Sequence, residues 1–406
     1  RRTGHGEHVD FSLLEAITLA GSGYLDLVAR LVGGHDFSRL PLSIETPSIE
    51  PTADGYVGFT TNSRQQVSDF MILIERPDLC EDEQLAQAYG RLARHAEALV
   101  PHYRLSAGTS LQGLLADKHT QYDLAARHGI PMPRTQFAQT TAEVEQFAAQ
   151  AVYPCLLKPT HFREWLRCSQ AHPLYARKIA IARSADELAE VYRQAAAINP
   201  LVILQEIIEG PDTGKRVYLS CYDVRGERIA HAMFRELRCE PLGFGPASVT
   251  EPVDDPETDA ICDGFLRRIG YVGLCEIEMK QDARDGRFKL IEANPRLSGG
   301  GDAAPHAGVE LAWLHYLDLI GQPVVPTGPS PRHFKHIVLR ADAVAAIEYL
   351  QAGLISWRDI VNTYRPPVAF FDLDAHDWRY SAETLYIAGR SALRGAARAL
   401  FSRSGR

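Results

Sequence analysis

The chain has 406 residues, more than the roughly 250–300 residues that one hydrophobic core usually organises, so two or three lobes are expected. Apolar residues make up 45% of it, which excludes a disordered protein. The net charge of −8 is spread along the chain and argues against a nucleic-acid-binding body. No run approaches 18 uninterrupted apolar residues, so no membrane span is expected.

The seven cysteines are scattered, odd in number and without Cys-x-x-Cys spacing. They predict reduced thiols in a cytoplasmic protein, with neither a disulfide framework nor a zinc site. Small molecules are the expected partners, and a homodimer is left open.

Residues 1–112 are predicted to form an N-terminal lobe of their own. An apolar stretch within 11–32 is interrupted by Gly21-Ser22-Gly23 and then continues with helical spacing. Strand, glycine turn and helix would open a Rossmann-like lobe; a purely helical stretch broken by a glycine turn is the alternative. Residues 82–99 repeat apolar side chains at helical spacing and predict an amphipathic helix.

The pattern sharpens from residue 113. Helices are predicted over 118–128, which ends at Gly129 before Pro131, and over 141–150, 185–197 and 258–268. Interleaved strands predict a pair of α+β lobes that clamp a ligand. These strands are expected near 154–159, 178–182, 202–208, 215–224, 228–235, 274–280 and 287–293. A helix beginning near Pro305 follows, and the tail after 330 has a further strand, a helix over 343–351 and a basic helix around Arg390.

Two neighbouring segments near residue 285 read as short strands joined by a turn. Alternation puts Glu276, Glu278 and Lys280 on one face of the first strand, and Glu292 with Asn294 on one face of the second. Carboxylates gathered on one face of a ribbon repel each other, so a cation is expected between them. Mg²⁺ takes one or two carboxylates together with nucleotide phosphates and fits that requirement. A solvated polar face is the alternative interpretation.

The turn predicts the register of these two strands. A two-residue turn at Asp285-Gly286 would set Glu278 opposite Ala293, on the wrong face. A three-residue loop over 284–286 instead ends on Gly286, the residue type that is free of strain in left-handed backbone. We therefore predict a three-residue hairpin with a bulge, in which Glu278 lies opposite Glu292 and faces the cleft, and Glu276 lies opposite Asn294.

These motifs resemble a known family. Glu278 followed by the run Glu292-Ala293-Asn294-Pro295-Arg296 resembles the metal-binding signature of the ATP-grasp ligases. Asp117-Lys118 at a helix start, the strand 153–159 with Lys158, and the segment 204–212 resemble the first nucleotide lysine, the second-lysine strand and the adenine and ribose hinge. The four pieces keep the order of the family over roughly residues 113–325, and the carboxylate–amine ligase branch is the most similar.

The resemblance implies an ATP-grasp fold, in which two α+β lobes clamp ATP, preceded by the Rossmann-like N-terminal lobe. Residues 113–210 would form the small ATP lobe and 211–325 the metal and catalytic lobe, with 326–406 as a C-terminal extension. Leu156, Leu157 and Ile208 would sandwich the adenine. Asp212 would bind the ribose, with Glu209 as the second choice. The residues implied to bind ATP are Lys118, Lys158, Gln205, Glu206, Ile208, Glu209 and Asp212.

The family also implies a metal and a reaction. Glu278, Glu292 and Asn294 would hold Mg²⁺, with Mn²⁺ as the alternative, and Arg296 would fork onto the transferring phosphoryl group. A carboxylate would be activated as an acyl phosphate and coupled to an amine, with release of ADP and phosphate; amino acids are candidate substrates. Lys215, Arg238 and Arg296 are the implied catalytic residues, and Arg235, Arg238 and His306 are candidates for substrate binding.

Two departures from the family pattern leave alternatives open. The segment 160–178 has no glycine, although many ATP-grasp proteins have a glycine-rich phosphate loop there. Either side chains replace the backbone N–H groups that hold the phosphates, or the segment is a mobile lid. The candidate side chains are Arg163, Trp165, Arg167, His172, Arg177 and Lys178. The substrate-binding part matches no specific ligase. An ATP-grasp kinase or carboxylase-type subunit, or a catalytically silent nucleotide-binding protein, is therefore kept as the alternative function.

Overall fold

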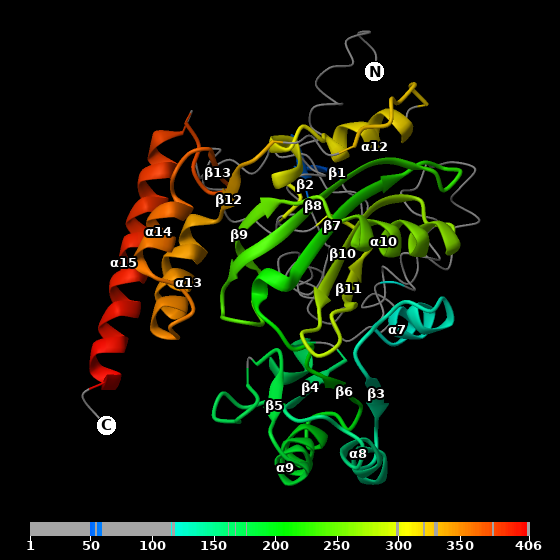
Figure 1. The fold of residues 1–406 in the computed structure, drawn as a ribbon, viewed down its shortest axis with the longest axis vertical. Helices are drawn as coiled ribbons and strands as arrows, with labels where there is room; N and C mark the ends of the chain where they lie inside the picture. The colour runs from blue at the N-terminus through cyan, green and yellow to red at the C-terminus, as the bar shows by residue number, and fades with distance from the viewer. Residues whose placement is uncertain are drawn as a thin grey trace.

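The computed structural model describes residues 49–52, 55–58, 115 and 118–403, except for 161, 167, 176, 298–299, 320, 329–331 and 376. Within the predicted N-terminal lobe it describes one antiparallel pair, β1 (Ile49–Thr52) and β2 (Gly55–Gly58). The predicted glycine turn at 21–23 and the helix over 82–99 lie outside the described residues. The rest of the described chain forms two α+β lobes, each around its own sheet (Figure 1).

The smaller sheet has four antiparallel strands in the order β3-β6-β4-β5. Helices α8 (Thr141–Ala148) and α9 (Ala185–Ala196) cover it (Figure 1). Helix α8 begins as predicted, because the Thr140 hydroxyl accepts a hydrogen bond from the N–H of Glu143 and completes a capping box. Three of the strands were predicted and β3 was not. Their bounds are β3 Thr135–Ala138, β4 Cys155–Pro159, β5 Ala180–Ala182 and β6 Val202–Glu206.

The larger sheet has seven strands in the order β11-β10-β7-β8-β9-β12-β13. One apolar cluster, which includes Tyr218 and Phe265, packs between it and helix α10 (Pro256–Arg268). A second cluster on the other face packs against the short helix α11 (Ala303–His306) and α12 (Leu311–Leu319). The strands are β7 Lys215–Tyr222, β8 Arg228–Cys239, β9 Ala247–Pro252, β10 Gly273–Gln281, β11 Phe288–Asn294, β12 Lys335–Ile337 and β13 Val368–Phe370.

The C-terminal residues share a sheet with the lobe that precedes them. Strand β12 pairs antiparallel with β9 and parallel with β13, so the region expected as an extension adds two strands to the larger sheet. Helices α13 (Leu339–Gln351), α14 (Trp357–Thr363) and α15 (Trp378–Arg403) follow, and α13 packs on β8, β9 and α15 (Figure 1). The predicted strand and two helices are confirmed; α14 and β13 were not predicted.

Helix α7 (Lys118–Arg127) precedes the small lobe in sequence but docks on the large one. The side-chain amide of Gln121 donates to the carbonyl of Ala293 at 2.5 Å, and the hydroxyl of Tyr122 donates to the carbonyl of Ile291 at 2.8 Å. The N–H of Leu290 also donates to the carbonyl of Pro131. Strand β11 is the last in its sheet, and these bonds satisfy backbone groups on its outer edge.

The hairpin of β10 and β11 has the predicted register at its polar end. Glu278 lies opposite Glu292, and Glu276 lies opposite Asn294. The predicted three-residue loop, however, is wrong. The register shifts by one between Glu278 and Met279, because Ile291 is an extra residue in β11, and the Tyr122 hydroxyl binds its carbonyl.

Towards the turn, the N–H of Asp282 donates to Arg287, so four residues form the loop, with Gly286 at a φ of 72° as expected for its role. Two differences from the prediction therefore cancel. The loop is one residue longer, and the bulge lies inside β11, so the two carboxylates still face each other.

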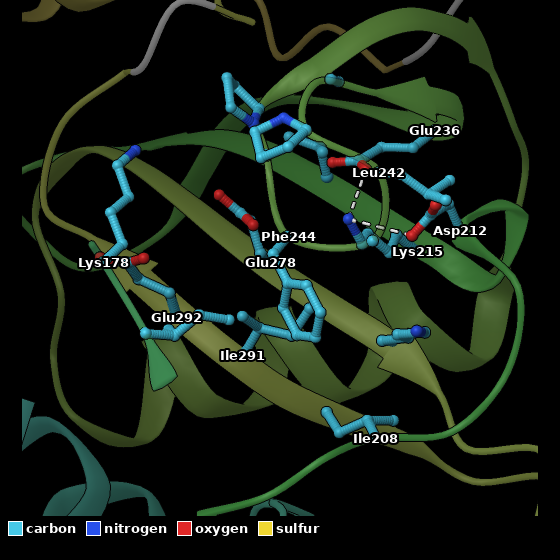
Figure 2. A pocket seen from close by; sticks show the side chains of 18 of the residues that line it. Lys178, Ile208, Asp212, Lys215, Glu236, Leu242, Phe244, Glu278, Ile291 and Glu292 are labelled. Carbon is cyan, nitrogen blue, oxygen red and sulfur yellow. Dashed lines mark ion pairs between the residues drawn. The ribbon is translucent and has the colours of Figure 1, made fainter. Parts of the chain in front are cut away.

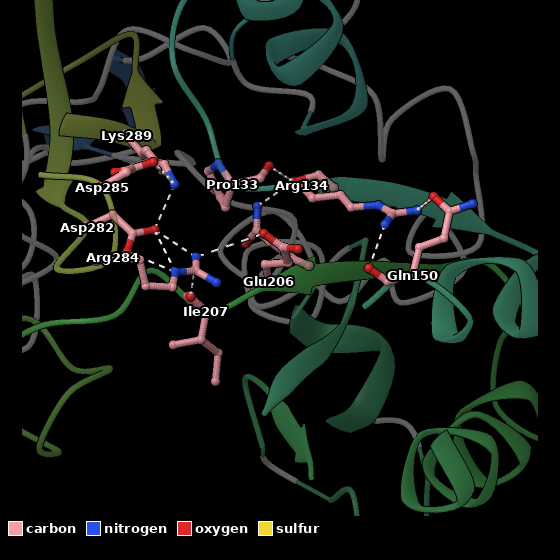
Figure 3. Close-up of polar contacts among 11 residues, drawn as sticks. Pro133, Arg134, Gln150, Glu206, Ile207, Asp282, Arg284, Asp285 and Lys289 are labelled. Atoms are coloured by element: carbon pink, nitrogen blue, oxygen red, sulfur yellow. Dashed lines mark hydrogen bonds and ion pairs between the residues drawn. The ribbon is translucent and has the colours of Figure 1, made fainter. Parts of the chain in front are cut away.

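The tip of this hairpin binds the segment that joins the lobes (Figure 3). The N–H of Ala283 donates to the carbonyl of Glu209 at 3.0 Å, and the Arg284 guanidinium donates to the carbonyl of Ile207 at 3.3 Å. Asp282, which is fully buried, holds the tip together through Arg284 and Lys289, each 2.7 Å from its Oδ2. Because the Ala283 N–H is used by the hinge, it is not available to close the predicted shorter loop.

We expect Asp282→Asn to lower the free energy of unfolding at neutral pH by about 1–3 kcal/mol, because it removes charge-assisted bonds to two cations. The hydrogen bond from Arg284, with that from Lys289, holds the pKa of Asp282 far below its ordinary value of 3.8. The unfolded chain therefore binds the proton first, so this stabilisation is present above pH 3.8 and is lost as the pH falls below it. Urea unfolding of both proteins across that range should show their difference shrinking in acid; a constant difference would contradict the assignment.

Two expectations drawn from composition can be compared with the described residues. All six cysteines among them are unpaired thiols, and Cys80 lies outside the described part. No helix in the described ranges is both long enough and apolar enough to cross a bilayer.

Candidate active site

A cleft of about 1750 Å³ lies between the lobes. The small lobe contributes β4, β6 and the segment before β5, and the large lobe contributes one face of its sheet (Figure 2). Single-ligand pockets usually measure about 300–1,000 Å³, so this cleft has room for more than one substrate. Most residues predicted from the sequence line it: Lys118, Lys158, Gln205, Glu206, Ile208, Glu209, Asp212, Lys215, Glu278, Glu292, Asn294 and Arg296.

Glu278 and Glu292 form the centre of the cleft. Their places on opposed positions of β10 and β11 put both carboxylates on the cleft face. Burial, followed by the nearby carboxylates of Glu276, Glu236 and Glu292, raises the pKa of Glu278 to about 8. Burial acts in the same direction on Glu292, but Lys118, 2.5 Å away, together with Lys158 and Arg296, holds the pKa of Glu292 below its ordinary value. Lys118 reaches this position because α7 docks on β11.

The donor set fits a hard cation. Glu278 and Glu292 supply two facing carboxylates, and the Asn294 amide, which donates to Glu276 Oε1 at 3.3 Å, lies one strand position further on. Among the described residues no three His, Cys, Asp or Glu side chains converge into a metal site by themselves. Mg²⁺ does not require such a cage, since it is commonly held by one or two carboxylates plus substrate phosphates.

Lys158 lies on the opposite, small-lobe wall. Its ammonium donates to the side-chain carbonyl of Gln205 at 3.0 Å, and Gln205 in turn donates to the Thr135 hydroxyl at 2.7 Å. Burial, and then the charge of Lys118, lowers the pKa of Lys158 to about 8. Two lysines that share one cleft disfavour each other's charge, and a bound anion relieves that cost. The small-lobe wall is therefore suited to phosphate oxygens.

Lys158→Ala should weaken nucleotide binding about tenfold or more, since a charge-assisted hydrogen bond in a buried site is lost. The apparent affinity for the second substrate should change far less. Calorimetric titration with ATP and Mg²⁺ measures the first effect. Lys335→Ala, a half-buried lysine on β12 that does not line the cleft, is the matched control. Equal ATP affinities for the two variants would remove Lys158 from the nucleotide site.

The hinge end of the cleft is apolar. Leu156 and Ile208 line it as expected, and Ile291, the bulge residue of β11, adds a third aliphatic wall. Leu157, expected to contact the base, is instead buried in the small-lobe core, because alternation along β4 points it away from the cleft. Glu209 is exposed at this end, and its carbonyl is occupied by the Ala283 N–H.

Asp212 is placed in the cleft but is already engaged. The hydroxyl of Tyr349, on α13, donates to Asp212 Oδ2, and Lys215 lies 3.4 Å from Oδ1. Burial would raise the pKa of Asp212, but these partners hold it below its ordinary value. Lys215 also lies 3.0 Å from Glu236 (Figure 2), and the carboxylates raise its pKa although burial alone would lower it. Helix α13 thus reaches Asp212, the residue expected to bind the ribose.

Arg235 and Arg238 were expected to frame the substrate pocket, and the structure corrects this. Arg235 is next to Glu236 on β8, so its side chain points to the opposite face of the sheet. There it forms an ion pair with Glu251, outside the cleft. Arg238 would share the face of Glu236, but a bulge in β8 shifts the register between them. Arg238 is consequently buried against Asp342, 2.8 Å away, and does not line the cleft.

The other candidates near the cleft differ in position. Arg296 lines the cleft with an exposed side chain whose Nη1 donates to the carbonyl of Leu297 at 3.2 Å. His306 is exposed at the end of α11, with its ring 5.9 Å from that of Phe334, and it does not line the cleft. Helix α11 begins at Ala303, before the predicted start at Pro305. Arg177 and Lys178 line the cleft, and Figure 2 shows Lys178 reaching into it.

Several cleft residues were not singled out from the sequence. Glu236, Thr250 and His336 lie on β8, β9 and β12, and Phe244 lies on the loop between β8 and β9. Alternation along β8 could have indicated Glu236, since Phe234 and Glu236 share a face. No pattern in the sequence places β9 next to β12, so Thr250 and His336 carried no signal.

The two α+β lobes enclose a cleft in which Glu278 and Glu292 lie on one wall and Lys158 on the other. This arrangement is suited to an anionic ligand bound together with a cation. No family model matches the chain. A D-aspartate ligase from Enterococcus faecium (strain Aus0004) is 27% identical over 198 residues, 46% of this chain and 45% of that protein. A D-alanine–D-alanine ligase from Marinobacter nauticus is 25% identical over 170 residues, 41% of this chain and 49% of that protein. Over this region the chain is similar in sequence to both ligases, which agrees with the resemblance of its motifs to the ATP-grasp carboxylate–amine ligases.

The chain spans about half the length of these curated relatives or less. Among solved structures, an N5-carboxyaminoimidazole ribonucleotide synthetase from Thermus thermophilus aligns over 58% of this chain and 61% of its own. The TM-score of that alignment is 0.45 and the identity is 17%.

Proposed function

We propose that this protein is an ATP-dependent carbon–nitrogen ligase that activates a carboxylate as an acyl phosphate and couples it to an amine. The observation that carries the proposal is the pair Glu278 and Glu292, opposed across β10 and β11 in a cleft whose other wall presents Lys158. A site with two carboxylates on one side and lysines on the other is suited to a metal-bound polyphosphate.

The proposed reaction has two steps, and the cleft residues bind the groups that take part in them. An oxygen of the substrate carboxylate attacks the γ-phosphorus of ATP, and the bond to the β-phosphate oxygen breaks to release ADP. The amine nitrogen then attacks the acyl carbon, the bond from that carbon to the phosphate oxygen breaks, and phosphate leaves with the proton that the nitrogen loses. Glu278, Glu292 and Asn294 would hold Mg²⁺, which supplies neutralisation of the phosphate charge when it is bound. Lys118 and Lys158 bind phosphate oxygens, and Arg296 is positioned to orient the transferring group.

The adenosine part is assigned to the hinge end. Leu156, Ile208 and Ile291 enclose the base, and the segment from Glu206 to Ile208 borders its edge. Asp212 or Glu209 would bind the ribose; Asp212 must then share its carboxylate with Tyr349.

The proposal is tested by measuring ADP release from ATP and Mg²⁺ with a matrix of amino acids and small carboxylic acids, each with and without an amine. A ligase releases ADP and phosphate in equal amounts only when acid and amine are both present, and the amide is found by mass spectrometry. ADP release with a phosphorylated acceptor and no free phosphate would indicate a kinase. Tight ATP binding without turnover across the whole matrix would indicate a silent nucleotide-binding protein.

A further inference from the structure

The end of the cleft furthest from the hairpin has a composition of its own. Across the large sheet, Lys215 on β7 is ion-paired to Glu236 on β8, Glu236 is directly opposite Thr250 on β9, and Thr250 is opposite His336 on β12. Directly opposed residues point to one face, with Cβ atoms roughly 4.5–5.5 Å apart. All four line the cleft, so they form a continuous polar row from the metal side to the strands that the C-terminal segment adds.

This row contains a hydroxyl group that lacks a hydrogen bond. Thr250 is 8% exposed, lines the cleft, and its hydroxyl has no hydrogen-bond partner among the described residues. His336 Nε2 lies 3.0 Å from Oδ2 of Asp302, which does not itself line the cleft. A buried polar atom left unpaired costs free energy, so a ligand that supplies the missing bond is favoured there.

We call the part of the row formed by Glu236, Thr250 and His336 the corner. The charges around this corner favour a hydrogen-bond donor over an anion. Glu236 brings a carboxyl group to it, and the carboxyl group of Asp302 lies behind the His336 ring. Lys215, the neighbouring cation, is already held between Asp212 and Glu236. Arg235 and Arg238 point away, as described above. A carboxylate ligand would therefore meet mainly other acceptors, whereas an amino group meets hydrogen-bond acceptors in the hydroxyl and the Glu236 carboxylate.

The walls beside the corner are apolar. Val338 and Ala341 at the start of α13, together with Phe371 beyond β13, line one side. Leu242 and Phe244, on the loop between β8 and β9, line the other, and Phe244 is 44% exposed. The N–H of Leu242 donates to Glu348 at 3.2 Å, so α13 also supports this loop. An apolar wall beside a few polar groups is the usual composition of a small-molecule site.

We propose that the corner formed by Glu236, Thr250 and His336 binds an amino group of the amine substrate other than the nitrogen that reacts near Glu278 and Glu292, and that this substrate carries an apolar chain along Val338, Ala341 and Phe371. The inference rests on the proposed ligase function, whose amine it describes. The C-terminal segment, which supplies β12 and α13, thereby determines which amine is accepted.

Direct binding tests this separately from turnover. The full chain, loaded with Mg²⁺ and a non-hydrolysable ATP analogue, is titrated by calorimetry with primary alkylamines from propylamine to hexylamine and with alcohols of equal length. Affinity should rise about fourfold per added methylene, as expected for burial of a CH₂ group, and the amines should bind more tightly than the alcohols. Alcohols that bind as tightly as the amines would overturn the amine site, and so would an amine series without any measurable binding.

Thr250→Val should weaken alkylamine binding about tenfold, since a hydrogen bond to a charged group is lost, while binding of the ATP analogue is unchanged. Thr258→Val is the matched control, because Thr258 is also buried and its hydroxyl also lacks a partner in the described residues, but it lies on α10 outside the cleft. Thr250→Ser, which keeps the hydroxyl, should bind like the parent, and Glu236→Gln, which removes a cleft carboxylate, should weaken binding if Thr250→Val fails to fold. Equal affinities of Thr250→Val and Thr258→Val would overturn the proposal.

The outcome is distinguishable from a failure of the ligase function. If the amine site is wrong, the acid and amine matrix can still yield ADP. If the ligase function is wrong, alkylamine binding can still depend on Thr250 although no ADP is released.

Discussion

Glu292→Gln is expected to reduce ADP release roughly 10–100-fold or more while leaving the fold intact. Glu292 faces Glu278 across the hairpin and is the carboxylate that Lys118 contacts at 2.5 Å. Glutamine keeps the shape of the side chain but removes the charge that a divalent cation and the phosphate-binding lysine both require. Steady-state ADP release at saturating ATP, with the acid and amine found by the screen, measures the effect, and circular dichroism measures the fold.

Glu257→Gln is the matched control for this change. Glu257 is an exposed glutamate in the first turn of α10, outside the cleft, so its replacement should leave turnover within about twofold. Mg²⁺ dependence is the second measurement, because a lost metal ligand should raise the Mg²⁺ concentration needed for half-maximal rate. Parental turnover with an unchanged Mg²⁺ requirement in Glu292→Gln would remove Glu292 from the metal site.

Arg238→Ala is expected to lower the free energy of unfolding by about 3–5 kcal/mol, because it leaves a buried carboxylate without its counter-charge. Two nitrogens of Arg238 bind Asp342 at 2.8 Å, and a third donates to Thr363 at 3.1 Å. Ser248 and Tyr364 also donate to the Asp342 carboxylate, at 3.0 and 2.7 Å. This buried pair joins β8 to α13 and α14, so its loss should also expose the chain after residue 335 to limited proteolysis.

Arg235→Ala on the same strand is the matched control. Arg235 is ion-paired to Glu251 but its side chain is 41% exposed, so its removal should cost about 1 kcal/mol or less. Replacing both partners of the buried pair, as Arg238→Met with Asp342→Leu, should restore much of the stability that Arg238→Ala loses, since no charge is then left unpaired. Thermal and urea unfolding compare the four proteins. Equal losses for Arg238→Ala and Arg235→Ala would contradict the buried pair.

The residues that could be predicted from the sequence are those governed by local rules. Alternation in two short strands indicates that Glu278 and Glu292 share a face, and a glycine in the turn makes a hairpin the natural connection. The loop length was wrong because it depends on contacts distant in sequence. The hinge takes the N–H of Ala283, and Tyr122 on α7 stabilises the bulge at Ile291. Neither contact leaves a signal in the hairpin itself.

Arg238 shows the limit most clearly. Two residues beyond Glu236 on a strand, it should share the cleft face, and an arginine there suits an anionic substrate. One bulge reverses that direction, and the partner that fixes the reversal, Asp342, is distant in sequence. The same holds for Thr250 and His336, which are neighbours only because the C-terminal segment returns to the edge of β9. Pairings between distant strands are what a single sequence does not specify by pattern.

The bond between the hairpin tip and the hinge determines how the two lobes can move. Because Ala283 and Arg284 are attached to the carbonyls of Glu209 and Ile207, the lobes are fixed to each other at that end. A rotation that widens the cleft therefore has its axis there, and displacement grows across the small sheet from β6 through β4 to the outer strand β5. Ile208 and Ile291, which lie next to that axis, would keep their geometry in such a motion, whereas Lys178, just before β5, would move further from Glu278 and Glu292. Opening of the cleft would thus change the contacts of the phosphate end of a nucleotide more than the contacts of its base.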